Sequence, residues 1–467
     1  MVNWQKIASF LPEVTRPLKK KLGFNEKLKW TGIVLVLYYV LLHIPLYGLG
    51  QNSLDQFEAL SIILGASFGS LISLGIGPIV TASIVLQLMV GSGILNFDLT
   101  KPEDRANFQS MQKVVQISFV ILEAIIYVIM GGLAPNPVLA GTTAFTFYQV
   151  VLILQLFIGG YMLILMDELV QKWGFGSGIS LFIAAGVSRQ IFITALSPFS
   201  SPTNPGVPIG RIPFLLYALR ASDPTGALLA IVAIIATIAV FMLAVYGQAM
   251  KVEIPLSFGR VRGYGIRWPL KFIYTSNIPV ILIAALLANI QLWARLLQNW
   301  GYPLLGTFSG NSPATGLVKW VNSPNIINAL VVGNATGEIV LQSIVYIAVM
   351  VIGSVFFSMM WVKTSNMGAD AQAKQILASG LQIPGFRRDP RVLESILNRY
   401  IPSLTVMGGA VVGFLAAFAD LSGALSRGTG ILLTVMIIYK LYEDIAKQHA
   451  YDMHPALRKF MAPDSSD

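Results

Sequence analysis

About ten long runs of hydrophobic residues alternate with more polar segments along the chain. Each run has roughly 18 to 25 residues, which is enough for a helix to cross the ~30 Å hydrocarbon core of a bilayer. Backbone polar groups in lipid must be satisfied within the protein, so each run is predicted to be an α-helix. The predicted spans are residues 30–48, 75–93, 112–132, 146–166, 178–196, 227–248, 272–294, 338–361, 401–420 and 429–446.

The composition supports an all-α polytopic membrane protein. Hydrophobic residues make up 55% of the 467 residues and charged residues only 12%, and the mean hydropathy is +0.69. A water-soluble domain of this size would need a far more polar surface. No cleavable signal peptide is predicted, because the first hydrophobic run is a full span and no A-x-A-like site follows it.

Few side chains are available for catalysis or metal binding. The chain has no cysteine and three histidines, which are His43, His449 and His454. Disulfides and thiolate metal sites are therefore excluded. We expect no metal site, no cofactor and no enzymatic activity.

The distribution of basic residues predicts the orientation in the membrane. With the N-terminus in the cytoplasm, 26 of the 32 lysine and arginine residues fall in inside segments and six fall outside. Cytoplasmic loops carry this excess in membrane proteins, so both ends of the chain are predicted to be cytoplasmic. The segment 189–220 is rich in proline and is predicted to be an irregular external loop.

The ten spans divide into two groups of five around this external loop. An odd number of spans per group would place a duplicated half upside down relative to its twin, although no repeat is visible in the residues. The predicted parts are a cytoplasmic N-terminal segment with an interfacial helix (1–28), an N-terminal half (29–200), a C-terminal half (201–446) with cytoplasmic loops 249–271 and 362–400, and a cytoplasmic tail (447–467).

A helix-like segment that is too short to cross precedes the second span. Residues 55–69 are hydrophobic but rich in small side chains, and Gly75, Gly77 and Pro78 then mark a joint between two helical segments. A half-helix that folds back into the membrane is tolerated only where protein or a water-filled cavity surrounds it. The segment therefore predicts an enclosed cavity, and an external surface helix is the other interpretation.

Glu123 is the one acidic residue predicted deep in the hydrocarbon, in the middle of the third span. Placing a carboxylate there costs about 2.5 to 3.5 kcal/mol, so the side chain should face polar partners or be protonated. A functional role and a packing hydrogen bond to a neighbouring helix are both open. A proton relay would need a second Asp, Glu or His at that depth, which makes coupled transport the weaker hypothesis.

Two glycine-rich patterns resemble enzyme motifs. Residues 65–69 match G-x-S-x-G, but Ser67 would need a base nearby, and among the histidines only His43 lies in a predicted span. Residues 174–178 resemble a phosphate loop without its lysine. Small residues in membrane segments produce such patterns by chance. We therefore predict no serine hydrolase, and we interpret residues 174–178 as the start of a helix.

The two long cytoplasmic loops carry clustered arginines. Arg260 and Arg262 lie in the first loop, and Arg387 and Arg388 are adjacent at a Pro-Gly turn in the second. The positive-inside bias alone also produces basic loops. Two neighbouring guanidinium groups nevertheless suit a polyanionic partner such as ribosomal RNA, whose binding would depend strongly on salt.

Five motifs in this order make the chain resemble the SecY family, whose members are central subunits of the protein-conducting channel, and it is most similar to the archaeal branch. The motifs are KLKWTG at residues 27–32, LGIGPIVTA at 74–82, GSGISLFIAAG at 176–186, VEIPL at 252–256 and YTSNIPVI at 274–281. The resemblance runs over nearly the whole chain. It is weaker in the plug region and in the external loops 197–226 and 296–337.

The resemblance implies an hourglass pore between the two halves, a ring of aliphatic side chains at its waist, a plug, a lateral gate and a ribosome-binding surface. The ring would comprise Ile76, Val80, Ile179, Ile183, Ile281 and Leu433. The plug, at 55–69, would include Phe57, Ala59, Leu60, Ile63, Leu64 and Ser67. Thr81, Glu123 and Asn289 would form a polar cluster at the lateral gate, and Arg260, Arg262, Arg387 and Arg388 would contact the ribosome.

The function that the resemblance implies is passage of secretory polypeptides across the membrane and lateral release of hydrophobic segments into lipid. The implied partners are a small single-span SecE/gamma subunit, a second small beta-type subunit, the ribosome, signal sequences and nascent polypeptides. The implied location is the cell membrane. A secondary transporter of a small solute is the alternative, and it would need polar side chains at several helix centres, where this chain offers mainly Glu123.

Overall fold

The computed structural model describes residues 11–18, 22–52, 65–91, 93–95, 97, 102–200, 206–258, 265–310, 312–378, 381–382 and 390–453. Every predicted span coincides with a helix. These helices are α2 (Phe24–His43), α4 (Gly77–Gly91), α5 (Pro102–Ile129), α6 (Thr143–Trp173), α7 (Gly178–Leu196), α9 (Pro224–Ala249), α10 (Ile278–Asn299), α13 (Gly337–Thr364), α15 (Pro390–Leu421) and α16 (Gly428–Met453). The predicted all-α polytopic fold is confirmed.

Several helices are longer than the hydrophobic runs that predicted them. The α5 helix begins ten residues before the predicted span at 112–132, and α15 begins before 401–420. The added turns carry charged residues. They can do so because a helix can continue past the hydrocarbon into water, where a hydropathy pattern does not mark its end. Among the described residues, seven helices are long and apolar enough to cross a membrane. The α4 helix is shorter, and α2 and α16 carry charged residues at one end.

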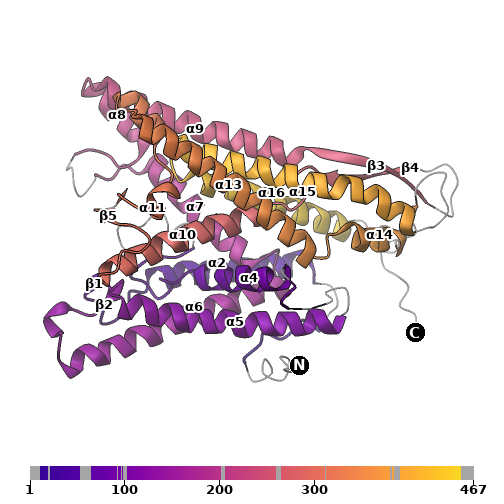
Figure 1. Cartoon of the computed structure of the whole chain (residues 1–467), viewed down its shortest axis with the longest axis horizontal. Helices are drawn as coiled ribbons and strands as arrows, with labels where there is room; N and C mark the ends of the chain where they lie inside the picture. Colours follow the sequence, from indigo (N-terminus) through magenta and orange to yellow (C-terminus); the bar gives the residue numbers. More distant parts are fainter. Residues whose placement is uncertain are drawn as a thin grey trace.

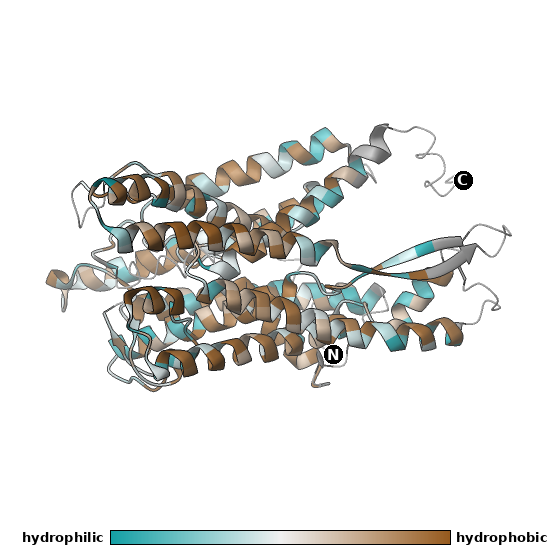
Figure 2. Cartoon of the chain, turned by 90° about the horizontal axis from the view of Figure 1, so that it is seen from above, coloured by the Kyte–Doolittle hydropathy of each residue, from teal (hydrophilic) through white to brown (hydrophobic). Residues whose placement is uncertain are grey.

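The helices pack side by side with their long axes roughly aligned (Figure 1). Helices α4, α5 and α6 of the first half lie along one side, α9, α13 and α15 of the second half lie along the other, and α10 lies between them. The long helices are hydrophobic along most of their length (Figure 2). Val36, Ile235 and Ile352, for example, are more than half exposed, as side chains that face lipid are expected to be.

The predicted inside and outside segments gather at opposite ends of the molecule. At one end, Lys27 near the start of α2 donates to Gln448 of α16 over 3.3 Å, and Lys271 pairs with Glu443 over 2.5 Å. At the other end, β1 (Gln51–Asn52) pairs with β2 (Leu133–Ala134). We call these the basic end and the opposite end. These contacts lie at opposite ends, as the predicted alternation requires, and which end faces the cytoplasm stays a prediction.

The basic end carries a small sheet that the hydrophobic pattern did not predict. Strands β3 (Lys251–Phe258) and β4 (Gly265–Lys271) form an antiparallel hairpin, and β7 (Leu381–Gln382) pairs with the outer part of β3. The two segments expected to be cytoplasmic loops thus meet in one sheet, whose order is β4-β3-β7. The second of them also contains helix α14 (Ala369–Ala378).

The opposite end has more regular structure than an irregular loop. Within 189–220, α7 continues to Leu196 and a further helix, α8, spans Arg211–Arg220. The prediction of an irregular loop is wrong for α8, because Pro213 sits in the first turn of that helix, where a backbone N–H has no partner within the helix. Pro198 and Pro208 lie outside helices, as predicted. The other short elements here are the 3-10 helix η2 (Pro137–Leu139), strands β5 (Phe308–Ser309) and β6 (Ser312–Pro313), and helices α11 (Leu317–Trp320) and α12 (Ile326–Val332).

The joint before the second span is present. Residues 71–76 are turns, and α4 begins at Gly77 with Pro78 in its first turn. Gly75 has φ +58°, a backbone conformation that glycine adopts without strain. Of the predicted plug, residues 65–69 are turns and irregular backbone and not helix, and its remaining residues lie outside the described part of the chain. Residues 1–10 and 19–21 of the predicted interfacial segment also lie outside the described part, and its residues 11–18 are not helical.

Candidate pore and gate

A cavity of about 330 Å³ enters the helix bundle from the basic end. Its mouth is polar and is lined by Gln112, Gln171, Lys440 and Asp444 among others. Its walls become aliphatic further in. There it is lined by Val80 of α4, Ile179 of α7, and Ile281 and Leu282 of α10. Three of the residues predicted for the ring therefore line the inner wall of a cavity whose mouth is polar.

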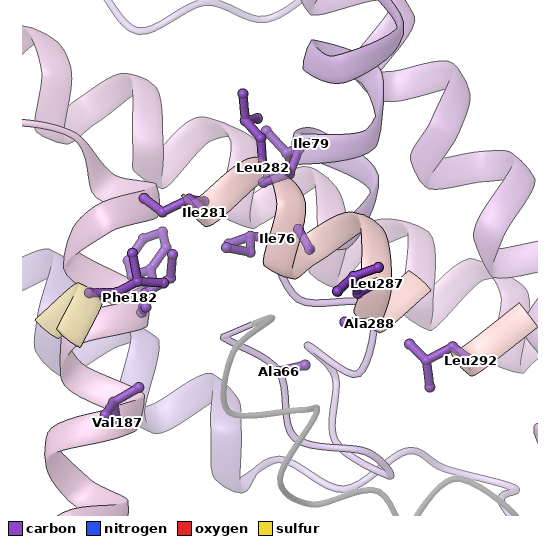
Figure 3. Packing of buried hydrophobic residues seen from close by; sticks show 14 of the residues in the cluster. Ala66, Ile76, Ile79, Phe182, Val187, Ile281, Leu282, Leu287, Ala288 and Leu292 are labelled. Atoms are coloured by element: carbon purple, nitrogen blue, oxygen red, sulfur yellow. The ribbon is translucent and has the colours of Figure 1, made fainter. Parts of the chain in front are cut away.

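The predicted ring residues lie in the hydrophobic interior, and three of them line the same cavity. Ile76, Val80, Ile183, Ile281 and Leu433 are all buried in one hydrophobic cluster, and Ile179 packs against it while partly exposed to the cavity. They come from α7, α10, α16, α4 and the turn before α4. Figure 3 shows Ile76 and Ile281 near each other, with Ile79, Leu282 and Phe182 around them. The structure thus joins aliphatic side chains of both halves at the inner end of the cavity.

The described residues at the end of the predicted plug lie against this cluster. Gly65 has φ +55°, and a Cβ added there would lie 3.5 Å from Phe182 and 3.7 Å from Ile76. The Tyr38 hydroxyl donates to the Gly65 carbonyl over 3.1 Å, and the Tyr38 ring stacks on Phe182 at 4.7 Å. Ala66 is buried in the same cluster. Sequence reasoning missed Tyr38 and Phe182, because an aromatic residue in a span is usually ordinary packing.

Serine side chains hold the turn that follows. The Ser70 hydroxyl donates to the Ser67 carbonyl over 2.7 Å, and the Ser73 hydroxyl donates to the Ser70 carbonyl over 2.5 Å. The Gly69 N–H donates to the Ser73 oxygen over 2.9 Å. Ser67 therefore belongs to a turn. His43, the base that a hydrolase would need, is bound to the carbonyl of Tyr39.

Two of the three predicted gate residues are in contact. The Asn289 side-chain amide on α10 donates to the Thr81 hydroxyl on α4 over 2.7 Å. Glu123 on α5 is fully buried, but neither of its carboxyl oxygens has a hydrogen-bond partner among the described residues. The expectation that the cluster supplies partners for Glu123 is therefore wrong for this structure. Thr81 uses its own proton on the carbonyl of Gly77 and accepts from Asn289.

The predicted ribosome contacts Arg260, Arg262, Arg387 and Arg388 lie outside the described residues. Their flanking segments are described and lie in the small sheet. Arg267 of β4 donates to Glu253 of β3 over 3.1 Å and is largely exposed. Both basic segments therefore extend from the same sheet at the basic end.

Residues 174–178 lead into α7, as predicted. Gly178 is the first residue of the helix, and a Cβ added there would lie 2.6 Å from the Cα of Asp167 on α6. The preceding turn is fastened to α2, because the Phe175 N–H donates to the Thr31 hydroxyl over 3.1 Å. The glycines thus allow close approach of two helices and serve no phosphate loop.

Comparison with known families decides what this arrangement is. The SecY family model matches residues 70–442, and that of the plug domain of Sec61p matches residues 36–69. The chain belongs to the SecY family. SecY proteins called protein translocase subunits are 48% identical in Methanothermobacter thermautotrophicus, with 98% of each chain covered, and 43% identical in Methanocaldococcus jannaschii, with 97% of each covered.

Solved structures related to the SecY family have the same fold. A structure described as a protein conducting channel is 42% identical and superposes with a TM-score of 0.83, with 97% of this chain and 99% of that chain covered. Sec61 in the canine ribosome-channel complex from the endoplasmic reticulum is 41% identical with a TM-score of 0.80 and the same coverage. The family expected from the five sequence motifs is confirmed.

Proposed function

We propose that the chain forms the pore of a protein-conducting channel, through which secretory polypeptides cross the membrane and from which hydrophobic segments move sideways into lipid. Membership of the SecY family over nearly the whole chain carries this proposal. The cavity that narrows to aliphatic side chains from both halves supports it, because a conduit for a flexible polymer needs a wide mouth and a soft constriction.

The proposed constriction is the ring of Ile76, Val80, Ile179, Ile183, Ile281 and Leu433. A dry aliphatic constriction excludes ions by dewetting, while flexible side chains can surround a moving peptide of variable size. The burial of five of these residues, with Ile179 packed against them and facing the cavity, is consistent with a closed, resting ring. The plug, residues 55–69, would cover the ring from the opposite end, since a Cβ added at Gly65 would lie 3.7 Å from Ile76.

The proposed lateral gate lies between α4 and α10, where Thr81 and Asn289 join the two halves. A signal sequence or a membrane segment would separate these helices and reach lipid between them. A single hydrogen bond between membrane helices is worth only about 0.6 kcal/mol on average. The bond can therefore favour the closed gate without preventing a hydrophobic substrate from opening it.

We further propose the partners, the location and the division of the chain. The basic tips at Arg260, Arg262, Arg387 and Arg388 would bind the ribosome. A single-span SecE/gamma subunit would clamp the halves 29–200 and 201–446, and a small beta-type subunit would join them. The complex would lie in the cell membrane with both ends of the chain in the cytoplasm. The Sec61 structure solved with a ribosome supports the ribosome as a partner.

Crosslinking of a stalled nascent polypeptide tests the proposal. Because the chain has no cysteine, single cysteine probes can be placed at Ile76, Ile183 and Ile281, with control probes at the lipid-facing Ile235 and Ile352. We expect crosslinks to a hydrophilic stalled chain from the three ring positions and none from the controls. Absence of crosslinks at every ring position would overturn the conduit.

A further inference from the structure

A buried aspartate holds the start of α7 from a neighbouring helix. Asp167 on α6 accepts the Ile179 N–H over 3.0 Å and the Ser177 hydroxyl over 3.3 Å. Its second carboxyl oxygen accepts from Gln171 over 2.8 Å. Ser177 is the N-cap residue of α7 but makes no capping bond with its own side chain. Asp167 on α6 therefore caps the N-terminus of α7 in place of the N-cap side chain.

An equivalent aspartate holds the start of α16 in the second half. Asp420 on α15 accepts the Thr429 N–H over 2.7 Å and also the Thr429 hydroxyl. The N–H and the hydroxyl bind different oxygens, and the oxygen that accepts from the hydroxyl also accepts from the Tyr346 hydroxyl of α13 over 2.6 Å. A carboxylate at a helix N-terminus is favoured by the helix dipole as well as by these bonds. In the first half a residue of α6 thus holds the start of α7, and in the second half a residue of α15 holds the start of α16.

The same device is visible in the sequence once the contacts are known. Residues 176–179 read G-S-G-I and residues 428–431 read G-T-G-I. Eight residues separate Asp167 from the first motif, and seven separate Asp420 from the second. The hydroxyl residue of each motif, Ser177 or Thr429, binds the aspartate. The accepted N–H differs, since it belongs to Ile179 in one half and to Thr429 itself in the other. This is a trace of the internal repeat that the sequence alone did not reveal.

The two devices lie at opposite ends of the molecule. The turn before α7 contacts Thr31 near the start of α2, and the far end of α16 contacts Lys27 on the same helix. The start of α16 is therefore at the end opposite to the start of α7, so the two helices run antiparallel. They also touch, because a Cβ added at Gly430 would lie 3.1 Å from Val187. Inverted halves require this arrangement.

Both fastened helices carry residues of the proposed ring close to the aspartate. Ile179 donates its own N–H to Asp167, and Ile183 follows one turn later. Leu433 lies one turn after Thr429. We propose that Asp167 and Asp420 are paired positioning residues that fix the height and rotation of α7 and α16, and so hold the ring side chains of each half in the closed constriction. This inference rests on the proposed function.

Labelling of ring positions tests the proposal without any translocation assay. Ile183→Cys and Leu433→Cys place single reporters at two positions that are at most 1% exposed. The measurement is the rate at which a small water-soluble maleimide modifies each reporter in reconstituted vesicles. Asp167→Ala should raise the labelling rate at position 183 about tenfold and leave the rate at position 433 within about twofold. Asp420→Ala should have the reverse effect. A tenfold change corresponds to about 1.4 kcal/mol, which is the size expected for loss of a charge-assisted hydrogen bond.

Matched variants separate positioning from general loosening. Asp167→Asn and Asp420→Asn keep one acceptor oxygen and should restore most of the protection. Asp223 caps α9 by accepting the Gly226 N–H over 3.1 Å, and α9 carries no proposed ring residue, so Asp223→Ala should change neither reporter. Equal rises at both reporters in any aspartate variant, or no rise in either alanine variant, would overturn the proposal.

Two further points keep the test decisive. If the alanine variants do not fold, Ser177→Ala and Thr429→Val remove only the hydroxyl donor and should give the same selective pattern at smaller amplitude; unchanged rates would overturn the proposal. If labelling is selective but nascent chains never crosslink to the ring, the positioning role stands and the polypeptide conduit fails.

Discussion

The Asn289 side chain on α10 donates a hydrogen bond to the Thr81 hydroxyl on α4, and this 2.7 Å contact joins residues 208 positions apart in the chain. It lies where the two halves meet, so we expect it to favour the closed state. Thr81→Val and Asn289→Leu should each raise resting ion conductance in reconstituted vesicles, and the double variant should add little to the larger single effect. The coupling between the two positions should be about 0.6 kcal/mol and at most about 1.7.

A bond within one half provides the control for this cycle. Gln112 on α5 donates to Ser83 on α4 over 3.1 Å, two residues along the same helix from Thr81. Ser83→Ala should leave the resting conductance unchanged, because it breaks no contact between the halves. Additive effects of Thr81→Val and Asn289→Leu would show that the bond does not couple the halves.

Glu123 should behave differently from its predicted neighbours. Its carboxyl group is buried without a hydrogen-bond partner among the described residues, and burial of an unpaired polar group is costly. Glu123→Gln should therefore change conductance little in the closed state, and its coupling to Thr81→Val should be near zero. A coupling as large as that between Thr81 and Asn289 would mean that the three side chains act as one cluster.

Sequence reasoning located the spans well because the length of a hydrophobic run is set by bilayer thickness. The predicted span 178–196 has the bounds of α7 itself. Helix ends in water were less predictable, since α5 and α15 continue into charged residues. The ring residues could be named only through the family motifs, because an isoleucine at the constriction has the same local pattern as one that faces lipid.

Long-range polar contacts were the least predictable features. The pairing of β3 with β7 joins residues of the two loops that are more than 100 positions apart in the chain. Asp167 and Asp420 were overlooked because both lie at the ends of predicted spans, where acidic residues are unremarkable. Glu123 attracted attention for its depth, yet its partners depend on how three helices pack, and local sequence carries no information about that.

Removal of the predicted plug should open a leak for ions. Replacing residues 56–64 with a glycine-serine linker of equal length keeps Gly65, its bond from Tyr38 and the serine turn intact, so only the cover of the ring is lost. We expect resting conductance to rise severalfold in vesicles. Tyr38→Phe serves as the comparison, because it keeps residues 56–64 and removes only the bond to Gly65. It should give a smaller rise in conductance. Unchanged conductance after the replacement would remove these residues from the seal.

Single cysteines should report the two sides of the membrane directly. Ser312 in β6 lies at the opposite end, and Asp370 in α14 lies at the basic end; both are exposed. In intact cells, an impermeant maleimide should label Ser312→Cys and should reach Asp370→Cys only after the membrane is permeabilised. Labelling of both positions in intact cells would contradict the predicted topology, and labelling of Asp370→Cys alone would reverse it.

Charge reversal at the second basic tip should weaken ribosome binding. Arg387→Glu with Arg388→Glu removes two adjacent guanidinium groups suited to phosphate oxygens. Each contact with a phosphate contributes roughly one counterion to the salt dependence of binding, so the slope of log affinity against log salt should fall by about two. Arg211→Glu with Arg220→Glu makes the same change in net charge on α8, at the opposite end, and should leave affinity unaltered. If the Arg387/Arg388 variant and the unmodified chain bind ribosomes equally at every salt concentration, this tip is excluded from the docking surface. If both charge-reversed variants lose the same affinity, the loss is a response to net charge alone.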